Sequence, residues 1–224
     1  MARTRRKAIV RGYALGWLAA IGLGLMLSRA AVVSGVGGAA DADARLAAGR
    51  VALTDRPYVG RVAVRDRSYA LRAPRIVVVK STRRLHLFDG ERYIKTYRVG
   101  LGVGDVGRKR LAGDGCTPEG DFRVVVKKPD GRFGRFLGIN YPNRAAINWG
   151  LRAGLVSLGE ALVLERAIEA GHMPNWTTDL GGGIGIHGGG AGSDWTAGCL
   201  ALDDADVDEL FDVMRVGDPV EVLP

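Results

Sequence analysis

One histidine and one cysteine stand in a glycine-rich stretch of this 224-residue sequence. His187 lies between two runs of glycines, at 181–183 and 188–190, and Cys199 follows twelve residues later (199 − 187). A nucleophilic thiol needs a base within hydrogen-bond reach and N–H donors that face the developing oxyanion. Gly198 lets backbone N–H groups approach a substrate carbonyl closely. These residue types can meet the needs of thiol acyl transfer, with Cys199 as the nucleophile and His187 as the base.

The residues that follow Cys199 predict a helix. Asp203 and Asp204 are typical N-terminal caps, and four apolar residues follow them at helical spacing, namely Val207, Leu210, Phe211 and Met214. The positive end of a helix near the thiol favours the thiolate. The alternative is that Cys199 is a small buried apolar residue and that the glycines form turns. The local pattern alone leaves both open.

The elements that must position His187 and Cys199 are mostly strands. Periodicity and turn residues predict strands at 75–80, 84–88, 92–99, 122–126 and 220–223, and a short strand at 184–186 that ends at His187. A capping box of Ser157 and Glu160 predicts a second helix, which ends near Gly171. We therefore expect a mixed α+β, β-dominated domain with one or two packed helices.

Several motifs resemble those of the L,D-transpeptidases, the YkuD-type cysteine enzymes of bacterial peptidoglycan. Residues 186–188 (Ile-His-Gly) and 196–202 (Thr-Ala-Gly-Cys-Leu-Ala-Leu) resemble the active-site signature of this family. The turn at 114–122 and the segment 138–143 resemble two further landmarks. The resemblance spans residues 76–224 and implies an L,D-transpeptidase-like β-sandwich or barrel.

The resemblance also implies a mechanism. Cys199 would attack the diaminopimelate carbonyl of a tetrapeptide stem, expel the terminal D-alanine and pass the acyl group to an amine of a second stem, which gives an L,D (3-3) cross-link. His187 would act as base and then as acid, oriented by the backbone carbonyl of Gly188. The N–H groups of Gly198 and Cys199 would form the oxyanion hole. Neither a metal nor a cofactor is required.

The segment just before Cys199 is the predicted substrate-binding part. Asp194, Trp195 and Thr196 resemble a sequence found in a subset of the family, and Trp195 would line the cleft or pack beneath the loop. Two positions depart from the family pattern: Ala197 stands where a histidine is usual, and Ala201 where an arginine is frequent. These departures leave the donor stem chemistry and the substrate preference open.

The departures and the chemistry allow other functions. Water as the acceptor would give a carboxypeptidase or endopeptidase, whereas Ala197 and Ala201 suggest a catalytically idle peptidoglycan-binding module. Two cysteines in an exported protein can form a disulfide, but bonding Cys116 to Cys199 would silence the enzyme, so we expect no such bond. Nothing marks a self-complementary face, and we expect a monomer.

The N-terminal region has the pattern of an export signal. Five cations lie among the first eleven residues, and residues 12–27 carry no charge. This pattern predicts a cleaved signal peptide or an uncleaved inner-membrane anchor over residues 1–40, a spacer over 41–75 and the catalytic domain over 76–224. Within the spacer, residues 61–65 alternate as an edge strand would. We expect the domain to be periplasmic or otherwise in the cell envelope.

The charge distribution argues against nucleic-acid binding. The chain has a net charge of +8, but residues 1–75 contain 14 Lys and Arg and only 4 Asp and Glu. Residues 76–224 therefore hold 18 basic and 20 acidic residues, whereas phosphate-backbone binding requires a basic domain.

Five other residues are weaker candidates. Arg132, Arg135 and Arg144 could bind an anionic stem or be solvated. His86 is expected on the polar face of a strand and His172 at the surface beyond a helix, and two histidines without clustered carboxylates make a poor zinc site.

Overall fold

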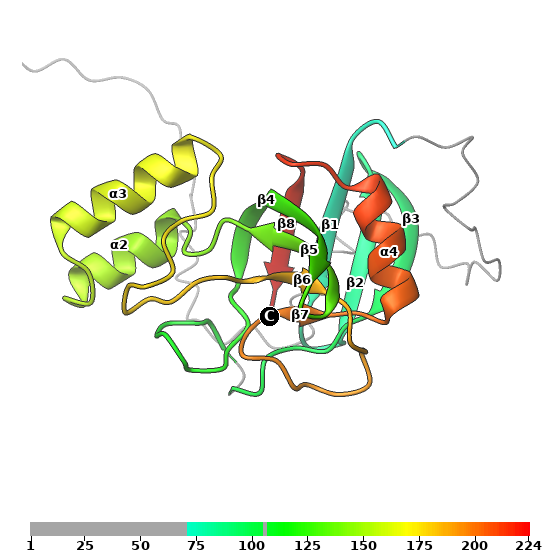
Figure 1. Ribbon diagram of the computed structural model, residues 1–224, viewed down its shortest axis with the longest axis horizontal. Coiled ribbons are helices and arrows are strands. Elements are labelled where there is room, and N and C mark those ends of the chain that lie inside the picture. The colour runs from blue at the N-terminus through cyan, green and yellow to red at the C-terminus, as the bar shows by residue number, and fades with distance from the viewer. Residues whose placement is uncertain (1–70, 105–106) are drawn as a thin grey trace, which may run out of the picture. The chain divides into compact units, whose positions relative to one another are not determined.

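The computed structural model describes residues 71–104 and 107–224. The predicted signal or anchor, and the alternating segment at 61–65, lie outside the described residues. The described part is a curled eight-stranded sheet with three helices (Figure 1). In chain order the elements are β1 (Pro74–Val79), β2 (Arg84–Asp89), β3 (Arg92–Arg98), β4 (Gly120–Gly131), β5 (Gly134–Ile139), α2 (Arg144–Arg152), α3 (Leu158–Glu169), β6 (Gly185–His187), β7 (Leu200–Ala201), α4 (Asp204–Val213) and β8 (Pro219–Leu223).

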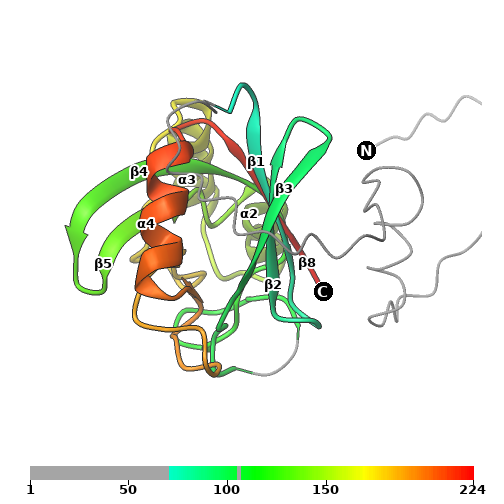
Figure 2. The same cartoon turned by 90° about the vertical axis from the view of Figure 1, so that its right-hand side faces the viewer.

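The sheet has the strand order β3-β2-β1-β8-β4-β5-β6-β7. The pairs β1/β8 and β6/β7 are parallel, and the other neighbours are antiparallel. The first part of β4 pairs with β8 and the remainder pairs with β5. Because β4 belongs to both halves, the sheet curls along it, and β4 and β5 swing away from β1 to β3 in Figure 2.

The main core fills the concave side of the curled sheet. Alternate residues of the strands face it, as the period of two requires. α4 closes it with Val207, Leu210 and Met214, which confirms the apolar stripe predicted for that helix. The strand residues of this core include Ile76, Val78, Leu85, Leu87, Phe122, Val124, Leu137, Ile139, Ile186, Leu200, Val220 and Val222.

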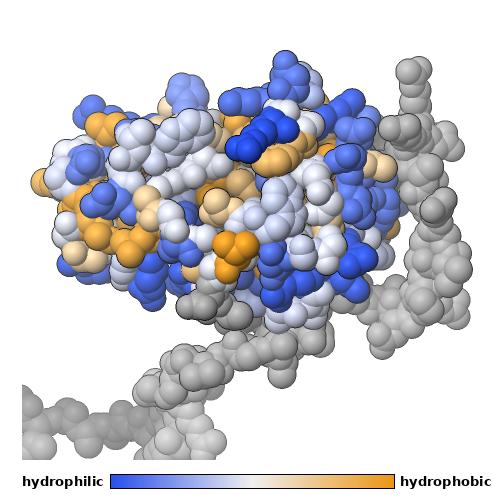
Figure 3. All heavy atoms as spheres, turned by 60° about the horizontal axis from the view of Figure 1, so that its bottom comes forward, coloured by the Kyte–Doolittle hydropathy of each residue, from blue (hydrophilic) through white to orange (hydrophobic). Residues whose placement is uncertain are grey.

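The helices α2 and α3 form a separate pair at the left of Figure 1. The predicted capping box of α3 is confirmed, with Ser157 and Glu160 bonding reciprocally. α2 was not predicted; it begins after Asn143, whose side chain accepts from the N–H of Ala146. Three apolar residues of α3 stay exposed, namely Leu158, Leu162 and Val163. Orange patches gather on this side of the molecule in Figure 3.

Most predicted elements are confirmed. The hairpin of β2 and β3, the strand β8 and the helices α3 and α4 lie within a few residues of their expected ranges. The sheet is more extensive than expected, since β4 continues to Gly131 and β5 follows it. No helix of the described residues is long and apolar enough to cross a membrane.

Candidate active site

His187 and Cys199 are brought to one place by two neighbouring parallel strands. β6 ends at His187, β7 begins directly after Cys199, and Ile186 lies opposite Leu200. Continuing this register by one residue places Cys199 beside Gly185, whose backbone N–H donates to the thiol. A strand rises about 3.3 Å per residue, so His187 follows about 7 Å further along β6. The topology therefore places a thiol and an imidazole at the same edge of the sheet.

The imidazole of His187 is buried and held in one orientation. Its Nδ1 lies 2.6 Å from the backbone oxygen of Gly188. Because a carbonyl oxygen can only accept, Nδ1 carries the proton and Nε2 keeps its lone pair. Burial lowers the pKa of His187 below its usual 6.5, and the bond to Gly188 opposes this shift to a smaller extent. At neutral pH the ring is therefore neutral and able to accept a proton.

The Cys199 thiol is not a preformed thiolate. Burial raises its pKa above the usual 9.0, while the N–H of Gly185 and the more distant cation of Lys109 lower it by less. The sulfur lies 3.7 Å from the backbone oxygen of Gly183, to which the S–H can donate. The expected effect of α4 on the thiolate stays a prediction, because the causes of this shift are burial, Gly185 and Lys109. Burial outweighs the favourable dipoles, and deprotonation of Cys199 needs a base.

A tight turn precedes Cys199. The hydroxyl of Thr196 donates to the backbone oxygen of Cys199 at 2.7 Å and accepts from the N–H of Gly198 at 3.1 Å. Gly198 has a φ of +126°, and a Cβ there would lie 2.7 Å from the backbone oxygen of Cys116. The turn is thus fixed from inside by Thr196 and from outside by the segment around Cys116. Substrate contact by Thr196 stays a prediction.

Asp194 and Trp195 anchor the loop between β6 and β7. The carboxylate of Asp194 binds the guanidinium of Arg83, with the shortest contact at 2.7 Å, and accepts from the N–H of Leu101. The indole N–H of Trp195 donates to the backbone oxygen of Gly190 at 3.0 Å. The ring of Trp195 meets His187 edge-on, with centroids 5.6 Å apart. Trp195 therefore adjoins His187, and its contact with substrate stays a prediction.

The two aspartates after Cys199 also hold this loop. Asp203 occupies the N-cap of α4, as expected, but its side chain makes no capping bond to that helix. Its carboxylate accepts from the N–H of Ala191 instead, and that of Asp204 accepts from the N–H of Gly189. The start of α4 is thereby tied to the residues that follow His187.

A second loop, at residues 107–119, packs against Gly198. Asp114 is its centre: the carboxylate binds the buried ammonium of Lys109 at 2.7 Å and accepts from the N–H groups of Arg110, Leu111 and Cys116. No disulfide joins Cys116 to Cys199, both of which lie in the described part of the chain. The loop therefore holds the backbone of Cys116 against the turn that precedes Cys199.

The contacts of the Asp114 carboxylate predict that the folded protein becomes less stable in acid. Burial opposes ionisation of Asp114, but the bonds from Lys109 and the three backbone N–H groups prevail and lower its pKa from 3.8 to about 2. Since the folded-state pKa is the lower one, the stabilisation is present above pH 4 and is lost as the pH falls through 2. We expect Asp114→Asn to remove about 1–2 kcal/mol from the difference between the unfolding free energies at pH 4 and pH 2, measured by urea denaturation.

The exposed Asp130 provides the control for this measurement. Asp130→Asn should leave the difference between pH 4 and pH 2 at its wild-type value. An unchanged difference in Asp114→Asn would show that other carboxylates determine the acid sensitivity.

The weaker candidates lie apart from the thiol or are engaged elsewhere. Arg135 forms ion pairs with Asp208 and Asp212 of α4, and Arg144 pairs with Glu169. Arg132 lies over the ring of Phe133, 5.2 Å from its centroid. His86, on β2, lies 2.6 Å from the hydroxyl of Thr96 through Nδ1, and His172 is exposed. Among the described residues, no three His, Cys, Asp or Glu side chains are grouped so as to hold a metal ion.

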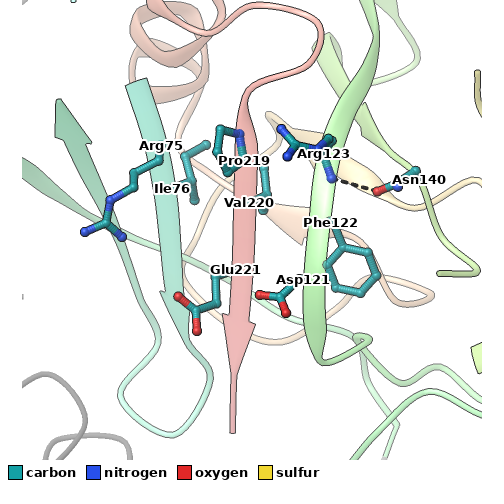
Figure 4. A pocket seen from close by; sticks show the side chains of 9 residues that line it. All are labelled: Arg75, Ile76, Asp121, Phe122, Arg123, Asn140, Pro219, Val220 and Glu221. Carbon is teal, nitrogen blue, oxygen red and sulfur yellow. Dashed lines mark hydrogen bonds between the residues drawn. The ribbon is translucent and has the colours of Figure 1, made fainter. Parts of the chain in front are cut away.

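A pocket of about 380 Å³ lies elsewhere, over β1, β8 and β4 (Figure 4). Its lining consists of Arg75, Ile76, Asp121, Phe122, Arg123, Asn140, Pro219, Val220 and Glu221. The carboxylates of Asp121 and Glu221 come from directly opposite positions of β4 and β8. None of the site residues predicted from the sequence lines this pocket.

A family model decides the family of this chain. The YkuD model, described as the L,D-transpeptidase catalytic domain, matches residues 73–222. The chain belongs to this family. The matched L,D-transpeptidase domain begins three residues before the boundary expected at 76, in keeping with the start of β1 at Pro74. No curated protein sequence matches the chain significantly.

Solved structures of L,D-transpeptidases are among those similar to this chain. The enzyme from Xylanimonas cellulosilytica is 16% identical with a TM-score of 0.41, and the alignment covers 67% of this chain and 60% of that one. L,D-transpeptidase 1 of Mycobacterium tuberculosis is 16% identical with a TM-score of 0.38, and the alignment covers 68% of this chain and 62% of that one. The helical cell shape determining protein Pgp2 of Campylobacter jejuni is 19% identical with a TM-score of 0.45, and the alignment covers 67% of this chain and 47% of that one. The chain spans between about half and three fifths of the length of these structures.

The two departures from the L,D-transpeptidase signature have different surroundings. Ala197 is exposed at the tip of the turn before Cys199, whereas Ala201 is fully buried between its pairing partners His187 and Gly100. Ala201 therefore lines no open surface. The sequence interpretation missed Arg83, Lys109 and Phe133, because each reaches the site through contacts between distant parts of the chain.

Proposed function

We propose that this L,D-transpeptidase family member is an exported cysteine acyltransferase that acts on peptidoglycan stem peptides. Cys199 is the nucleophile and His187 the general base. One observation carries the proposal: a buried histidine, oriented by the Gly188 carbonyl and with a pKa lowered by burial, lies two residues along β6 from Gly185, which borders the thiol. A base in this state suits a thiol whose pKa is raised, because the thiol cannot ionise unaided at neutral pH.

The proton and the bonds can be followed through the reaction. Nε2 of His187 takes the thiol proton while the sulfur attacks the diaminopimelate carbonyl of a donor stem. The tetrahedral intermediate collapses, the bond to D-alanine breaks, and His187 returns the proton to the departing amine. An amine of a second stem then attacks the thioester and gives up a proton through His187. This step forms the L,D (3-3) cross-link and regenerates the thiol.

Backbone N–H groups of Gly198 and Cys199 are proposed to stabilise the oxyanion. The N–H of Gly198 now donates to Thr196, so it must exchange this partner for the substrate oxygen as charge develops. An oxyanion-hole donor contributes about 10²- to 10³-fold to the rate in comparable enzymes. The donor stem is then bordered by Asp194, Trp195 and Thr196. Asp194 is held in place by Arg83, and Trp195 by the backbone oxygen of Gly190.

The proposal includes the cellular setting. Residues 1–40 act as a signal peptide or an inner-membrane anchor, residues 41–75 as a spacer, and the catalytic domain works as a monomer in the periplasm or cell envelope. Peptidoglycan is the partner, and no nucleic acid is involved. The basic and apolar N-terminal sequence supports this setting.

The test is mass spectrometry of the reduced, purified chain after incubation with a disaccharide tetrapeptide. We expect release of D-alanine, a thioacyl adduct on Cys199 and a cross-linked dimeric product. Cys199→Ala should abolish all three, while the matched control Cys116→Ala should retain them. Hydrolysed monomer in place of the dimer would show that water is the acceptor. An untouched substrate that nevertheless binds would contradict the proposal and favour an idle binding module.

A further inference from the structure

Phe133 stands at the tip of the β4/β5 hairpin and stacks on the proposed base. The centroids of its ring and of the His187 imidazole lie 4.9 Å apart, with an interplanar angle of 25°. Trp195 meets both rings edge-on, at 5.1 Å from Phe133 and 5.6 Å from His187. Phe133 is nevertheless 37% exposed. An aromatic ring that covers an imidazole at the surface does little for the core, so its contact with His187 needs another explanation.

The backbone fixes this stack as well. The carbonyl of Phe133 accepts from the N–H of Gly188 at 3.1 Å, and the carbonyl of Gly188 binds Nδ1 of His187. A Cβ at Gly188 would lie 2.8 Å from the oxygen of Phe133 and 2.4 Å from a carboxylate oxygen of Asp204. The hairpin tip and the residue after the histidine therefore fit together as closely as backbones can.

Contacts with Gly188, Phe133 and Trp195 together restrict the imidazole. Rotation about the last side-chain bond of histidine has only a broad, roughly two-fold preference, so an unsupported ring would sample many planes. The hydrogen bond to Gly188 chooses the nitrogen that faces the backbone. The Phe133 ring sets the plane and keeps water from one face, and the edge of Trp195 limits tilting. Nε2 then remains as the nitrogen available to a thiol.

We propose that Phe133 is a positioning residue for His187, which holds the imidazole plane and shields one face of the ring from water. The inference rests on the proposed function in assigning His187 as the base. The contacts that carry it lie on three elements: the hairpin tip, the end of β6 and the loop after it.

Charged groups approach this cluster from each element packed around it. Asp204, in the first turn of α4, binds the N–H of Gly189, and Arg132 lies over the Phe133 ring. Arg135 of β5 is paired with α4, and the Cys199 thiol lies before β7. The net direction for His187 is a pKa lowered by burial. Removing the Phe133 ring admits water, so the pKa of His187 should rise toward 6.5.

The experiment compares Phe133→Ala, Phe133→Leu and Phe133→Tyr with the wild-type chain. NMR titration of the His187 ring nitrogens reports its pKa and tautomer without any substrate, and steady-state kinetics separate kcat from KM. We expect Phe133→Ala to raise the His187 pKa and to lower kcat about 3- to 10-fold, with KM within about twofold. Phe133→Leu should lower kcat as Phe133→Ala does, because it lacks a flat ring, but its apolar volume should keep the His187 pKa closer to the wild-type value. Phe133→Tyr should keep wild-type behaviour.

Several results would overturn the inference. One is a His187 titration that is identical in wild type, Phe133→Leu and Phe133→Ala; another is a loss confined to KM, which would make Phe133 a substrate contact. Leu162→Ala, at an exposed position of α3, is the control for nonspecific effects. If the wild type transfers no acyl group, the proposed function fails, and the substrate-free titration still decides the role of Phe133. If Phe133→Ala does not fold, the comparison of Phe133→Leu with Phe133→Tyr takes its place.

Discussion

Replacement of His187 by alanine is expected to slow acyl transfer by about 10²- to 10⁴-fold, the usual contribution of a general base. The Cys199 thiol has a pKa raised by burial, so without a base the fraction of thiolate at neutral pH is very small. The measurement is the initial rate of D-alanine release, together with the rate constant for alkylation of Cys199 by iodoacetamide. His172→Ala is the matched control, because His172 is exposed. It should keep the wild-type rate.

The pH dependence of the rate tests whether His187 acts as a general base. His187 acts as a base only when neutral, and its lowered pKa keeps it neutral to below pH 6.5. The wild-type rate should therefore persist through neutral pH and fall as the pH drops through the His187 pKa. In His187→Ala the alkylation rate should follow the thiolate fraction alone, so the two proteins should converge at alkaline pH. A constant ratio of rates across the whole range would argue against general-base catalysis by His187.

Glu119→Gln is expected to remove about 3–5 kcal/mol from the free energy of unfolding. Glu119 accepts from the Lys80 ammonium at 2.9 Å, and the two side chains are only 9% and 7% exposed. The backbone oxygens of Gly107 and Thr117 complete the contacts of Lys80. Without the carboxylate, a buried positive charge would lose its only counter-charge at that distance among the described residues. Urea denaturation at pH 7 measures the loss.

Two further variants separate the buried pair from ion pairs in general. Glu169→Gln removes an ion pair with Arg144 whose side chains are 61% and 60% exposed, and it should cost at most about 1 kcal/mol. Lys80→Met combined with Glu119→Leu should be much more stable than Glu119→Gln, because no unpaired buried charge remains. Arg108, which also pairs with Glu119 at 3.5 Å, is 67% exposed and stays solvated. Equal losses in Glu119→Gln and Glu169→Gln would show that burial does not govern the Lys80 pair.

The predictable part of the fold is the part set by local patterns. The buried run at residues 76–79, the capping box at Ser157 and the helical spacing from Val207 to Met214 each predict the element that the structure contains. The end of β4 could not be predicted this way, because Lys127 and Lys128 resemble a solvated loop. The ammonium of Lys127 binds the backbone oxygens of Phe211 and Met214 near the end of α4, a contact that only the folded chain provides.

The same division applies to the candidate site. His187 and Cys199 can be singled out from composition and spacing, and the resemblance to a family signature adds Gly188 and the chemistry. The ionisation of Cys199 could not be predicted, since burial depends on loops that are distant in sequence. Phe133 gives no local signal, because it precedes His187 by 54 residues (187 − 133) and meets it only when β5 pairs with β6.

The position of β8 bears on the order of events during synthesis. β8 lies between β1 and β4 in the sheet, although it is the last of the described strands along the chain. In a nascent chain that lacks β8, neither β1 nor β4 has its β8 neighbour, and the bridge between Gly100 and Ala201 must link β1 to β3 with β4 to β7. Pairings between distant segments form slowly, because loop closure costs chain entropy. The sheet that supports Cys199 is therefore completed only after β8 has been synthesised, so we expect the surroundings of the thiol to reach their folded form later than the synthesis of the thiol itself.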